Sequence, residues 1–219
     1  MKGASNSTIL VPSASAPAGI NTIKSLKMVN YPVRIVASDS NPFSAGFFMS
    51  DAYEVLPEID SKLYITRLLE IVTKHKINVL MPSSGYDIYQ YSANKEKLLK
   101  LGALPVVSDI KTMKICRDKI QTFNYLSKKF ELPFTTLDYK KVKGFPLIAK
   151  PRYGKGSKGI VKINNENELK YVRFNSENLI FQEYLPGTEY TIDVLSDMEC
   201  EPILAVPRVR VETRAGIST

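Results

Sequence analysis

A glycine-rich segment between two apolar runs is the feature that most constrains the fold of this chain. Residues 145–149 form a short apolar run typical of a buried strand, which ends at Lys150. Small residues and lysines then alternate, and residues 160–163 alternate apolar and polar side chains, which indicates a second strand. The small residues are Gly154, Gly156, Ser157 and Gly159. The sequence therefore predicts a hairpin of two strands joined by a flexible glycine-rich loop.

The composition of this loop is typical of a phosphate-binding segment. Glycines allow positive φ, so that successive N–H groups converge on one anion, while Lys150, Lys155 and Lys158 add positive charge. The three glycines also match the G-x-G-x-x-G pattern, but a dinucleotide fingerprint precedes a helix, whereas a strand is expected here. No Lys-Ser or Lys-Thr pair follows the last glycine, which excludes a P-loop. An ordinary solvated hairpin with lysines at its tip is the alternative.

The first half of the chain alternates strand and helix patterns. Strands are expected at residues 7–11, 33–37, 53–56, 77–81 and 104–107, and helices at 18–29, 62–76 and 86–101. Such alternation predicts an α/β fold with a Rossmann-like parallel sheet and helices on its faces. We expect this N-terminal domain to cover residues 1–108.

Polar residues follow the strands of this expected sheet. Ligands of open parallel sheets gather at the carboxyl ends of the strands, which marks a set of candidate pocket residues. They are Ser13, Asp39, Ser83, Ser84 and Asp87. Ser83 and Asp87 are the candidates for binding substrate or phosphate, because hydroxyl and carboxylate groups beside a helix start can hold a polar group. Helix capping explains them at least as well.

The second half has an antiparallel character. A helix is expected at 109–129, then the glycine-rich hairpin, a helix at 165–174, and strands at 178–184, 189–195 and 202–211. We expect a boundary near the start of this region.

Charge and composition favour a local anion site in a globular protein. The chain has 219 residues, 44% of them hydrophobic, and a formal net charge of +8. Many of its lysines gather about the hairpin, which favours an anion site there, although a solvated basic face is the alternative.

Cys116 and Cys200 lie far apart and predict free, buried thiols in a reducing compartment. The only histidine, His75, ends a helical run, which predicts a surface or C-terminal-turn residue. No long apolar run or signal segment is present, so we expect a cytoplasmic protein that binds no membrane.

The order of these features resembles the ATP-grasp superfamily, and most closely its members of the carbamoyl-phosphate synthase large-subunit type. Residues 117–119 read Arg-Asp-Lys, residues 150–151 read Lys-Pro, the glycine-rich loop follows, and residues 182–189 read Q-E-Y-L-P-G-T-E. The alternating front half is similar to the family's N-terminal domain. The resemblance implies a small ATP-grasp subdomain at 109–184 and the start of a larger subdomain at 185–219. The expected fold is therefore a Rossmann-like sheet followed by an incomplete α+β ATP-grasp domain.

The resemblance also implies roles for individual residues. Lys119 and Lys150 match the two basic residues that hold the nucleotide phosphates, and the loop from Gly154 to Gly159 matches the segment that closes over them. Adenine would be read by residues matching the interdomain linker, with a side-chain contact from Gln182. These linker residues are Glu183, Tyr184 and Leu185. Glu189 matches the carboxylate that binds the ribose hydroxyls.

The end of the sequence departs from the family pattern. Magnesium ligands of the family lie well beyond the ribose-binding carboxylate, and the acidic residues after Glu189 do not match them. We therefore expect a C-terminally truncated chain with no metal ligands of its own, which would bind nucleotide but be inactive alone. Arg208, Arg210 and Arg214 are candidates for the phosphate or acid-substrate side of the cleft, unless they are solvated strand residues.

The resemblance implies a ligase that uses ATP and Mg²⁺. Its substrates would be a small-molecule carboxylate, activated as an acyl phosphate, and an amine or ammonia. A homo-oligomer is compatible with the sequence. One alternative is a non-catalytic nucleotide-binding module that needs a partner or further chain. Nucleic-acid binding is the other, and the absence of aromatic residues among the lysines and of a recognised motif weighs against it.

Overall fold

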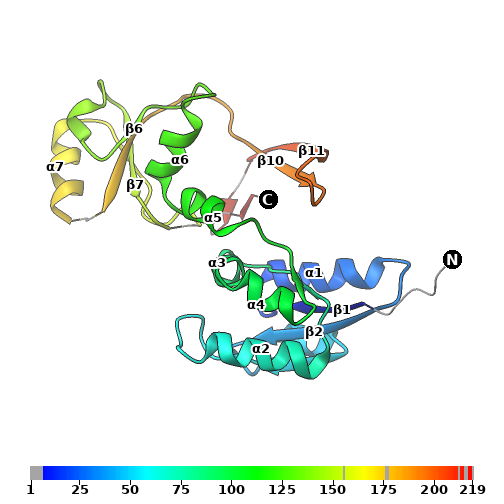
Figure 1. The fold of residues 1–219 in the computed structure, drawn as a ribbon. Coiled ribbons are helices and arrows are strands. Elements are labelled where there is room, and N and C mark those ends of the chain that lie inside the picture. Colours follow the sequence, from blue (N-terminus) through cyan, green and yellow to red (C-terminus); the bar gives the residue numbers. More distant parts are fainter. Residues whose placement is uncertain (1–6, 155, 176–177, 212, 215–216, 219) are drawn as a thin grey trace. The chain divides into compact units, whose positions relative to one another are not determined.

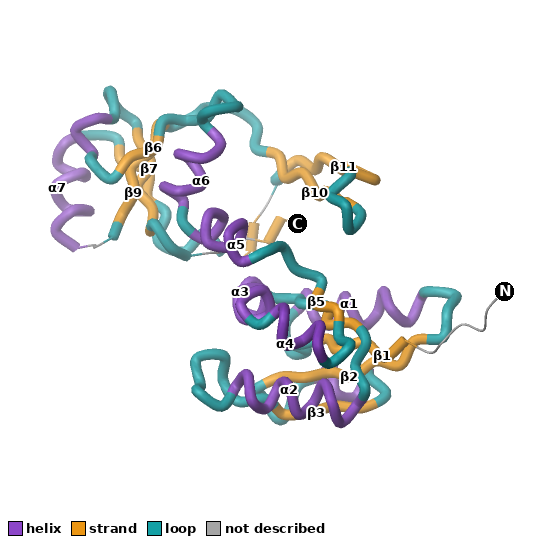
Figure 2. The backbone as a smooth tube through the Cα atoms, viewed as in Figure 1, coloured by secondary structure: helices purple, strands orange, loops and turns teal. Residues whose placement is uncertain are grey.

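The computed structural model describes residues 7–154, 156–175, 178–211, 213–214 and 217–218. The chain divides into two compact units, residues 1–113 and 114–219, which are taken in turn below. Figures 1 and 2 show the elements of both units. Among the described residues, no helix combines the length and the apolar character needed to cross a membrane.

The first unit is built on a five-stranded parallel sheet, as the sequence predicts. Its strand order is β3-β2-β1-β4-β5, and every neighbouring pair is parallel. The strands are β1 (Ser7–Val11), β2 (Val33–Asp39), β3 (Ala52–Val55), β4 (Val79–Leu80) and β5 (Leu104–Pro105). The order reverses direction at β1, so the crevice beyond the carboxyl ends of β1 and β4 is the topological switch point of the sheet.

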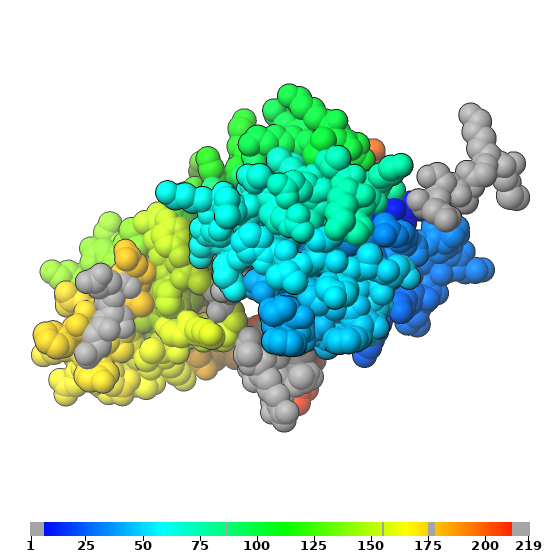
Figure 3. Space-filling view, turned by 90° about the horizontal axis from the view of Figure 1, so that it is seen from below, coloured from blue at the N-terminus to red at the C-terminus, as the bar shows by residue number. Residues whose placement is uncertain are grey.

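Helices cover both faces of this sheet. They are α1 (Pro17–Met28), the short η1 (Ala45–Met49), α2 (Tyr64–His75), α3 (Gly85–Ala93) and α4 (Lys95–Lys100). Successive residues of a strand point to opposite faces, so Leu10 packs in the core under α2, α3 and α4 while Ile9 packs in the core under α1 and η1. Figure 1 shows α1 and α2 on opposite sides of the sheet, and the segment around β3 and α2 is cyan in the space-filling view of Figure 3.

The single helix predicted at 86–101 is wrong, because it is interrupted at Asn94. The backbone of Asn94 has φ −112° and ψ 17°, and α4 begins after it. The side-chain amide of Asn94 donates to the carbonyl oxygen of Gln90 and so satisfies one of the last carbonyls of α3.

The second unit contains a four-stranded antiparallel sheet in the order β6-β9-β7-β8. Its strands are β6 (Thr135–Thr136), β7 (Leu147–Pro151), β8 (Val161–Ile163) and β9 (Leu179–Glu183). The short η2 (Tyr139–Lys141) lies between β6 and β7 in the chain. Helix α7 (Glu166–Asn175) covers one face, where Leu147 and Ala149 of β7 are buried with Leu169 of the helix. The alternation of β7 therefore turns Ile148 and Lys150 to the other face.

That other face lies toward α6 (Lys119–Leu126), as Figure 1 shows. The sequence predicts one helix at 109–129, but the structure has α5 (Ile110–Arg117) and α6 with Asp118 between them. The backbone of Asp118 is extended, at φ −108° and ψ 109°, and its side chain caps α6. The capping carboxylate explains the break, since an N-cap residue must leave helical φ and ψ.

A separate antiparallel ribbon follows, formed by β10 (Tyr190–Ser196) and β11 (Pro202–Val209), and a short pair, β12 (Thr213–Arg214) and β13 (Ile217–Ser218), comes after it. The register of the ribbon sets Ile192 against Pro207 and Val194 against Ala205, so one of its faces is apolar. Ile192 is nevertheless 60% exposed.

The prediction that the cysteines are buried is wrong. Both Cys116 and Cys200 are free but exposed. Cys116 lies on α5, which has no buried residue among its side chains, and Cys200 lies in the turn of the exposed ribbon.

Candidate functional site

A cavity of about 300 Å³ opens on the face of the second unit's sheet that α7 does not cover. Lys119 and Lys150 line it together with Gln182 and Thr135, and α6 adds an apolar wall that includes Phe123. Three of these residues, the two lysines and Gln182, are predicted site residues from three separate stretches of sequence. Apolar walls with a few convergent polar groups are typical of a small-molecule site, and the volume is at the lower end of the usual range.

A directed chain of hydrogen bonds fixes Lys150 in this cavity. Its Nζ donates to Oε1 of Gln182 at 2.7 Å, and Nε2 of Gln182 donates to Oγ1 of Thr135 at 2.7 Å. Oγ1 of Thr135 in turn donates to the carbonyl oxygen of Pro133 at 2.9 Å. The ladders of the sheet produce this arrangement, because Gln182 on the central strand β9 pairs with Thr135 on one side and with Ile148 on the other. The amide of Gln182 therefore orients a lysine rather than standing free.

Lys119 meets the same region from the first turn of α6. Its Nζ donates to the carbonyl oxygens of Pro151 at 2.9 Å, Arg152 at 3.4 Å and Gly154 at 3.1 Å. Three carbonyl acceptors match the three donors of an ammonium group. The lysine is thus bound to the segment where β7 passes into the glycine-rich loop.

The pKa values of both ammonium groups are lowered. Burial lowers the pKa of Lys150, and the charge of Lys119 lowers it further. Burial also lowers the pKa of Lys119, while the neighbouring carboxylate of Asp118 acts in the opposite sense. A half-buried pair of cations whose pKa values are depressed gains most from a multiply charged anion placed beside them.

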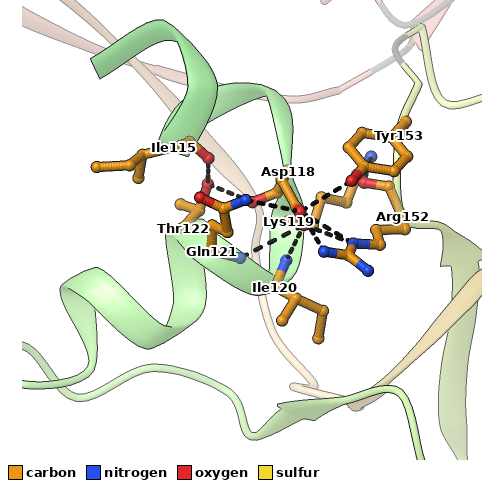
Figure 4. A network of polar contacts seen from close by, with 8 residues as sticks. All are labelled: Ile115, Asp118, Lys119, Ile120, Gln121, Thr122, Arg152 and Tyr153. Atoms are coloured by element: carbon orange, nitrogen blue, oxygen red, sulfur yellow. Dashed lines mark hydrogen bonds and ion pairs between the residues drawn. The ribbon is translucent and has the colours of Figure 1, made fainter. Parts of the chain in front are cut away.

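Asp118 is the centre of the polar network in Figure 4. Its side chain is 1% exposed, and its Oδ1 accepts from the backbone N–H groups of Ile120 at 3.0 Å and Gln121 at 3.4 Å. The guanidinium group of Arg152 donates through Nε at 2.9 Å and through Nη2 at 2.5 Å, and the hydroxyl of Tyr153 donates at 3.1 Å. The hydrogen bonds from Arg152, followed by those from Tyr153 and the helix N–H groups, hold the pKa of Asp118 far below its usual range. This network ties α6 to the start of the loop.

The sequence prediction missed Asp118, Arg152 and Thr135 as site residues. An aspartate followed by a helical pattern is an N-cap signal, so Asp118 could have been found that way. No local pattern points to Arg152 or Thr135, because their partners lie 34 and 47 residues away along the chain.

The glycine-rich loop joins β7 and β8, as expected. Positive φ occurs at its small residues, and the φ values are 136° at Gly154, 68° at Gly156, 56° at Ser157 and 73° at Gly159. A Cβ at Gly159 would lie 3.0 Å from Cγ of Pro151, so this glycine also allows a close approach to the end of β7. Lys155 of the predicted loop lies outside the described residues.

Gln182, the predicted side-chain contact to adenine, lines the cavity described above. The other predicted adenine and ribose residues do not line it. Glu183 ends β9 and pairs with Phe134 through its backbone N–H at 2.9 Å. Nζ of Lys162 lies 4.0 Å from the centre of the Tyr184 ring, and Leu185 is exposed. Oε1 of Glu189 accepts from Nη1 of Arg210 at 2.9 Å.

The arginines of the ribbon are engaged by carboxylates. Arg210 pairs with Glu189, and Nε of Arg208 donates to Oδ2 of Asp193 at 2.6 Å. Asp193 and Arg208 lie on β10 and β11, whereas Glu189 directly precedes β10 and Arg210 directly follows β11. The side chain of Arg214 lies outside the described residues. Neither Arg208 nor Arg210 lines the lysine cavity.

In the first unit, Asp87 gathers several predicted residues at the switch point of the parallel sheet. It is buried, and its Oδ2 accepts from the hydroxyls of Ser13 at 2.8 Å and Ser84 at 2.6 Å, while its Oδ1 accepts from Tyr64 at 3.0 Å. Burial, followed by the charge of Asp87, raises the pKa of Tyr64. The Asp87 carboxylate therefore binds the loop after β1 to the start of α3.

Two other predicted residues of that unit make separate contacts. The hydroxyl of Ser83 donates to the carbonyl oxygen of Pro12. Asp39 accepts from the N–H groups of Ser15 at 2.6 Å and Asn41 at 2.9 Å. These contacts shape the loops at the ends of β1 and β2.

Comparison with known families matches both units of the chain. A family model described as "ATP-grasp domain" matches residues 116–217, and one described as "PylC-like, N-terminal domain" matches residues 9–107. Together they cover nearly all of the described chain.

Two kinds of curated relatives are similar in sequence. The carbamoyl phosphate synthase large chain of Clostridium botulinum (strain Loch Maree / Type A3) is 26% identical over 200 residues, which cover 83% of this chain and 18% of that protein. The D-alanine–D-alanine ligase of Thermotoga sp. (strain RQ2) is 29% identical over 128 residues, 52% of this chain and 40% of that protein. The chain thus spans well under half the length of these relatives.

Solved structures share the fold at low sequence identity. The biotin carboxylase domain of the Hydrogenobacter thermophilus 2-oxoglutarate carboxylase has a TM-score of 0.76 at 17% identity, covering 96% of this chain and 51% of that one. N5-carboxyaminoimidazole synthetase from Staphylococcus aureus has a TM-score of 0.71 at 17% identity, covering 96% and 56%. The resemblance read from the sequence is therefore confirmed: the chain has an ATP-grasp domain at residues 116–217, and a PylC-like N-terminal domain at residues 9–107 precedes it.

Proposed function

We propose that this chain forms the nucleotide-binding part of an ATP-dependent carboxylate–amine ligase. The observation that carries the proposal is the meeting of Lys119 and Lys150 at one cavity, beside the root of a glycine-rich loop. We also propose the subdivision of the ATP-grasp region into a small subdomain at 109–184 and the start of a larger one at 185–219.

In the proposed reaction an oxygen of a small-molecule carboxylate attacks the γ-phosphorus of ATP, and the bond to the leaving ADP breaks. The nitrogen of an amine or ammonia then attacks the acyl carbon, loses a proton and expels inorganic phosphate. Lys119 and Lys150 would stabilise the negative charge that moves onto the transferring and leaving oxygens. Residues 154–159 would cover the phosphates and exclude water from the acyl phosphate.

The relatives support nucleotide as the ligand. The biotin carboxylase domain of H. thermophilus has been solved with MgADP, ADP and bicarbonate, and the S. aureus synthetase with ADP. The names of the curated relatives are those of ligases. We extend to this chain the use of ATP with Mg²⁺, and a small carboxylate and an amine or ammonia as substrates. The H. thermophilus domain is a dimer, and we extend a homo-oligomeric state to this chain on the same basis.

Magnesium is the part of this proposal that the described residues do not fit. Among them, no three His, Cys, Asp or Glu side chains lie close enough together to hold a metal ion. Glu189, directly before the ribbon, and Asp193 within it are paired with arginines. We therefore assign no step of the reaction to a metal held by these residues.

The base and sugar of the nucleotide are assigned by the resemblance. Glu183, Tyr184 and Leu185 would read the adenine edge, mainly through backbone groups, and Glu189 would bind the ribose hydroxyls. Arg210 holds Oε1 of Glu189. A ribose would therefore bind to the remaining Oε2 or displace this guanidinium group.

Isothermal titration of the 219-residue chain with ADP, with and without Mg²⁺, tests the proposal. We expect Lys150→Ala to weaken ADP binding by about 10- to 100-fold, the usual value of hydrogen bonds to a charged group. Lys170→Ala removes an exposed lysine from α7, on the opposite face of the same sheet, and should leave ADP binding unchanged. Equal affinity of the parent chain and Lys150→Ala would contradict the phosphate site, and failure of the parent to bind ADP would contradict the proposed function.

A further inference from the structure

The contacts of Asp118 exceed what a helix cap requires. Capping of α6 uses its Oδ1, which accepts from the N–H groups of Ile120 and Gln121. The same carboxylate also accepts hydrogen bonds from Nε and Nη2 of Arg152 and from the hydroxyl of Tyr153. Both residues belong to the segment that follows β7. Figure 4 shows these side chains converging on Asp118. A cap alone would need neither of them.

Lys119, the next residue, contacts the backbone of the same segment. Its ammonium group binds the carbonyl oxygens of Pro151, Arg152 and Gly154, and its own N–H donates to the carbonyl oxygen of Arg152 at 3.3 Å. The N-cap residue of α6 and the first residue of the helix therefore both hold residues 151–154. Asp118 binds the side chains of Arg152 and Tyr153, and Lys119 binds backbone carbonyl groups. We call residues 151–154 the loop root.

We propose that Asp118 is a positioning residue, which holds Lys119 and the loop root in place for a nucleotide polyphosphate through its hydrogen bonds to Arg152 and Tyr153. The proposal rests on the proposed function for the identity of the ligand. Asp118 itself is buried and acts through Lys119 and the loop, so it does not contact the ligand.

The physical reason is that the carbonyl groups around Lys119 move with the loop root. If Arg152 loses its buried anionic partner, residues 151–154 are no longer fixed to α6, and the three acceptors of the Lys119 ammonium shift with them. Displacement of a positioned group by a fraction of an ångström is enough to weaken a site that depends on its geometry. The effect should be largest for ligands that carry phosphates, because the loop root lies beside the lysines.

The sign of the effect separates positioning from simple electrostatics. Removal of a carboxylate close to an anion site should strengthen anion binding if only Coulomb forces act. Loss of positioning should weaken it instead. Asp118→Asn makes this comparison cleanly, since asparagine caps a helix about as well as aspartate.

The experiment is isothermal titration of the full chain with Mg-free ADP and with adenosine, for the parent, Asp118→Asn, Arg152→Gln and the double variant. We expect ADP affinity to fall by about tenfold in each single variant, as loss of a positioning contact predicts. Adenosine affinity should stay unchanged, and the double variant should bind ADP no more weakly than Arg152→Gln alone. A change shared equally by adenosine would indicate a merely structural role and overturn the proposal, as would tighter or equal ADP binding by Asp118→Asn.

The matched control is Asp138→Asn, the same change at the capping aspartate of η2. Its Oδ1 accepts from the N–H of Lys140 at 3.1 Å, and we expect unaltered ADP binding. Amide hydrogen exchange of residues 152–159 provides a readout without nucleotide, and Asp118→Asn should accelerate it while Asp138→Asn should not. If the parent chain binds no ADP, the proposed function fails, and unchanged exchange in Asp118→Asn would then overturn the positioning role as well.

Discussion

The Nζ of Lys150 donates to Oε1 of Gln182 at 2.7 Å. This bond sets the direction of the hydrogen bonds from Gln182 to Thr135 and from Thr135 to Pro133. Because Oε1 is the acceptor for a lysine, Nε2 of Gln182 must face Thr135, whose hydroxyl hydrogen then points to Pro133. A neutral amide fixes the lysine without neutralising it. That is what a phosphate site requires, since an anionic partner would compete with the ligand for the same charge.

Replacement of the amide by a carboxylate should therefore disable the site with little change in shape. We expect Gln182→Glu to lower ADP affinity by about tenfold, because the new anion pairs with Lys150 and repels the phosphates. Titration with ADP measures the effect, and the loss should shrink at high salt. Asn167→Asp makes the same kind of change on the exposed surface of α7 and should leave affinity intact. Unchanged ADP binding in Gln182→Glu would show that Lys150 does not contact phosphate.

Two glycines with nearly the same positive φ allow the close approach at the end of β7 to be tested. Gly159 has φ 73° and Gly144 has φ 72°, but an added Cβ would approach Pro151 to 3.0 Å at Gly159 and meets nothing within 4 Å at Gly144. Alanine at either position should cost about 1 kcal/mol of stability from the left-handed conformation alone. Only Gly159→Ala should also displace Pro151, the neighbour of Lys150, and so weaken ADP binding. Urea unfolding and ADP titration of the two variants separate these effects, and equal ADP affinities would contradict the displacement.

The fold was largely predictable because its strands are short apolar runs with clear ends. β1 occupies the predicted residues 7–11, and the strands and glycine-rich loop around Lys150 follow from alternation and small residues. The predicted lysines and Gln182 meet at one cavity because they lie on the same face of neighbouring elements. Patterns of this kind are local, so sequence alone reveals them.

The rest depended on contacts between distant residues. The pair of Asp118 with Arg152 joins positions 34 residues apart, and only the folded sheet brings the end of β7 to the start of α6. Helical propensity favoured one helix through Asp118, whereas the capping bonds and Arg152 stabilise a break there. The sequence predicts that Cys116 is buried, but α5 has no buried residue in this structure. Tertiary context decided each of these cases.

The first unit contains a buried acid whose loss should be costly. Glu54 has an 8% exposed side chain and accepts from Arg67 at 2.8 Å, Lys74 at 2.6 Å and His75 at 2.7 Å. Burial alone raises the pKa of Glu54, but hydrogen bonds from Lys74 and His75 outweigh it, so that the net pKa is lowered. We expect Glu54→Ala to destabilise the unit by about 3 kcal/mol, since three cationic or polar partners lose their acceptor. Thermal unfolding measures this.

Glu70 provides the control for that prediction, because it binds the same arginine on the surface. Its side chain is 56% exposed, and it accepts from Nη1 of Arg67 at 3.0 Å. Exposed pairs of this kind contribute little, so Glu70→Ala should change stability by less than about 0.5 kcal/mol. Equal losses of stability in Glu54→Ala and Glu70→Ala would show that the buried cluster contributes no more to stability than the exposed ion pair.

Acid should selectively weaken the contact between α6 and the loop root. Folding lowers the pKa of Asp118 well below the usual range of an aspartate, mainly through the hydrogen bonds from Arg152. A carboxyl group with a depressed folded pKa stabilises the protein at pH values above its unfolded pKa, and this contribution is lost as the pH falls through the folded pKa. Asp118→Asn cannot titrate, so the parent chain should be more stable than the variant at pH 7, and the difference should shrink progressively below about pH 4. Urea unfolding followed by circular dichroism at several pH values gives both curves, and Asp138→Asn should run parallel to the parent. A gap between parent and Asp118→Asn that stays constant down to pH 2 would mean that the charge of Asp118 does not cause the difference in stability.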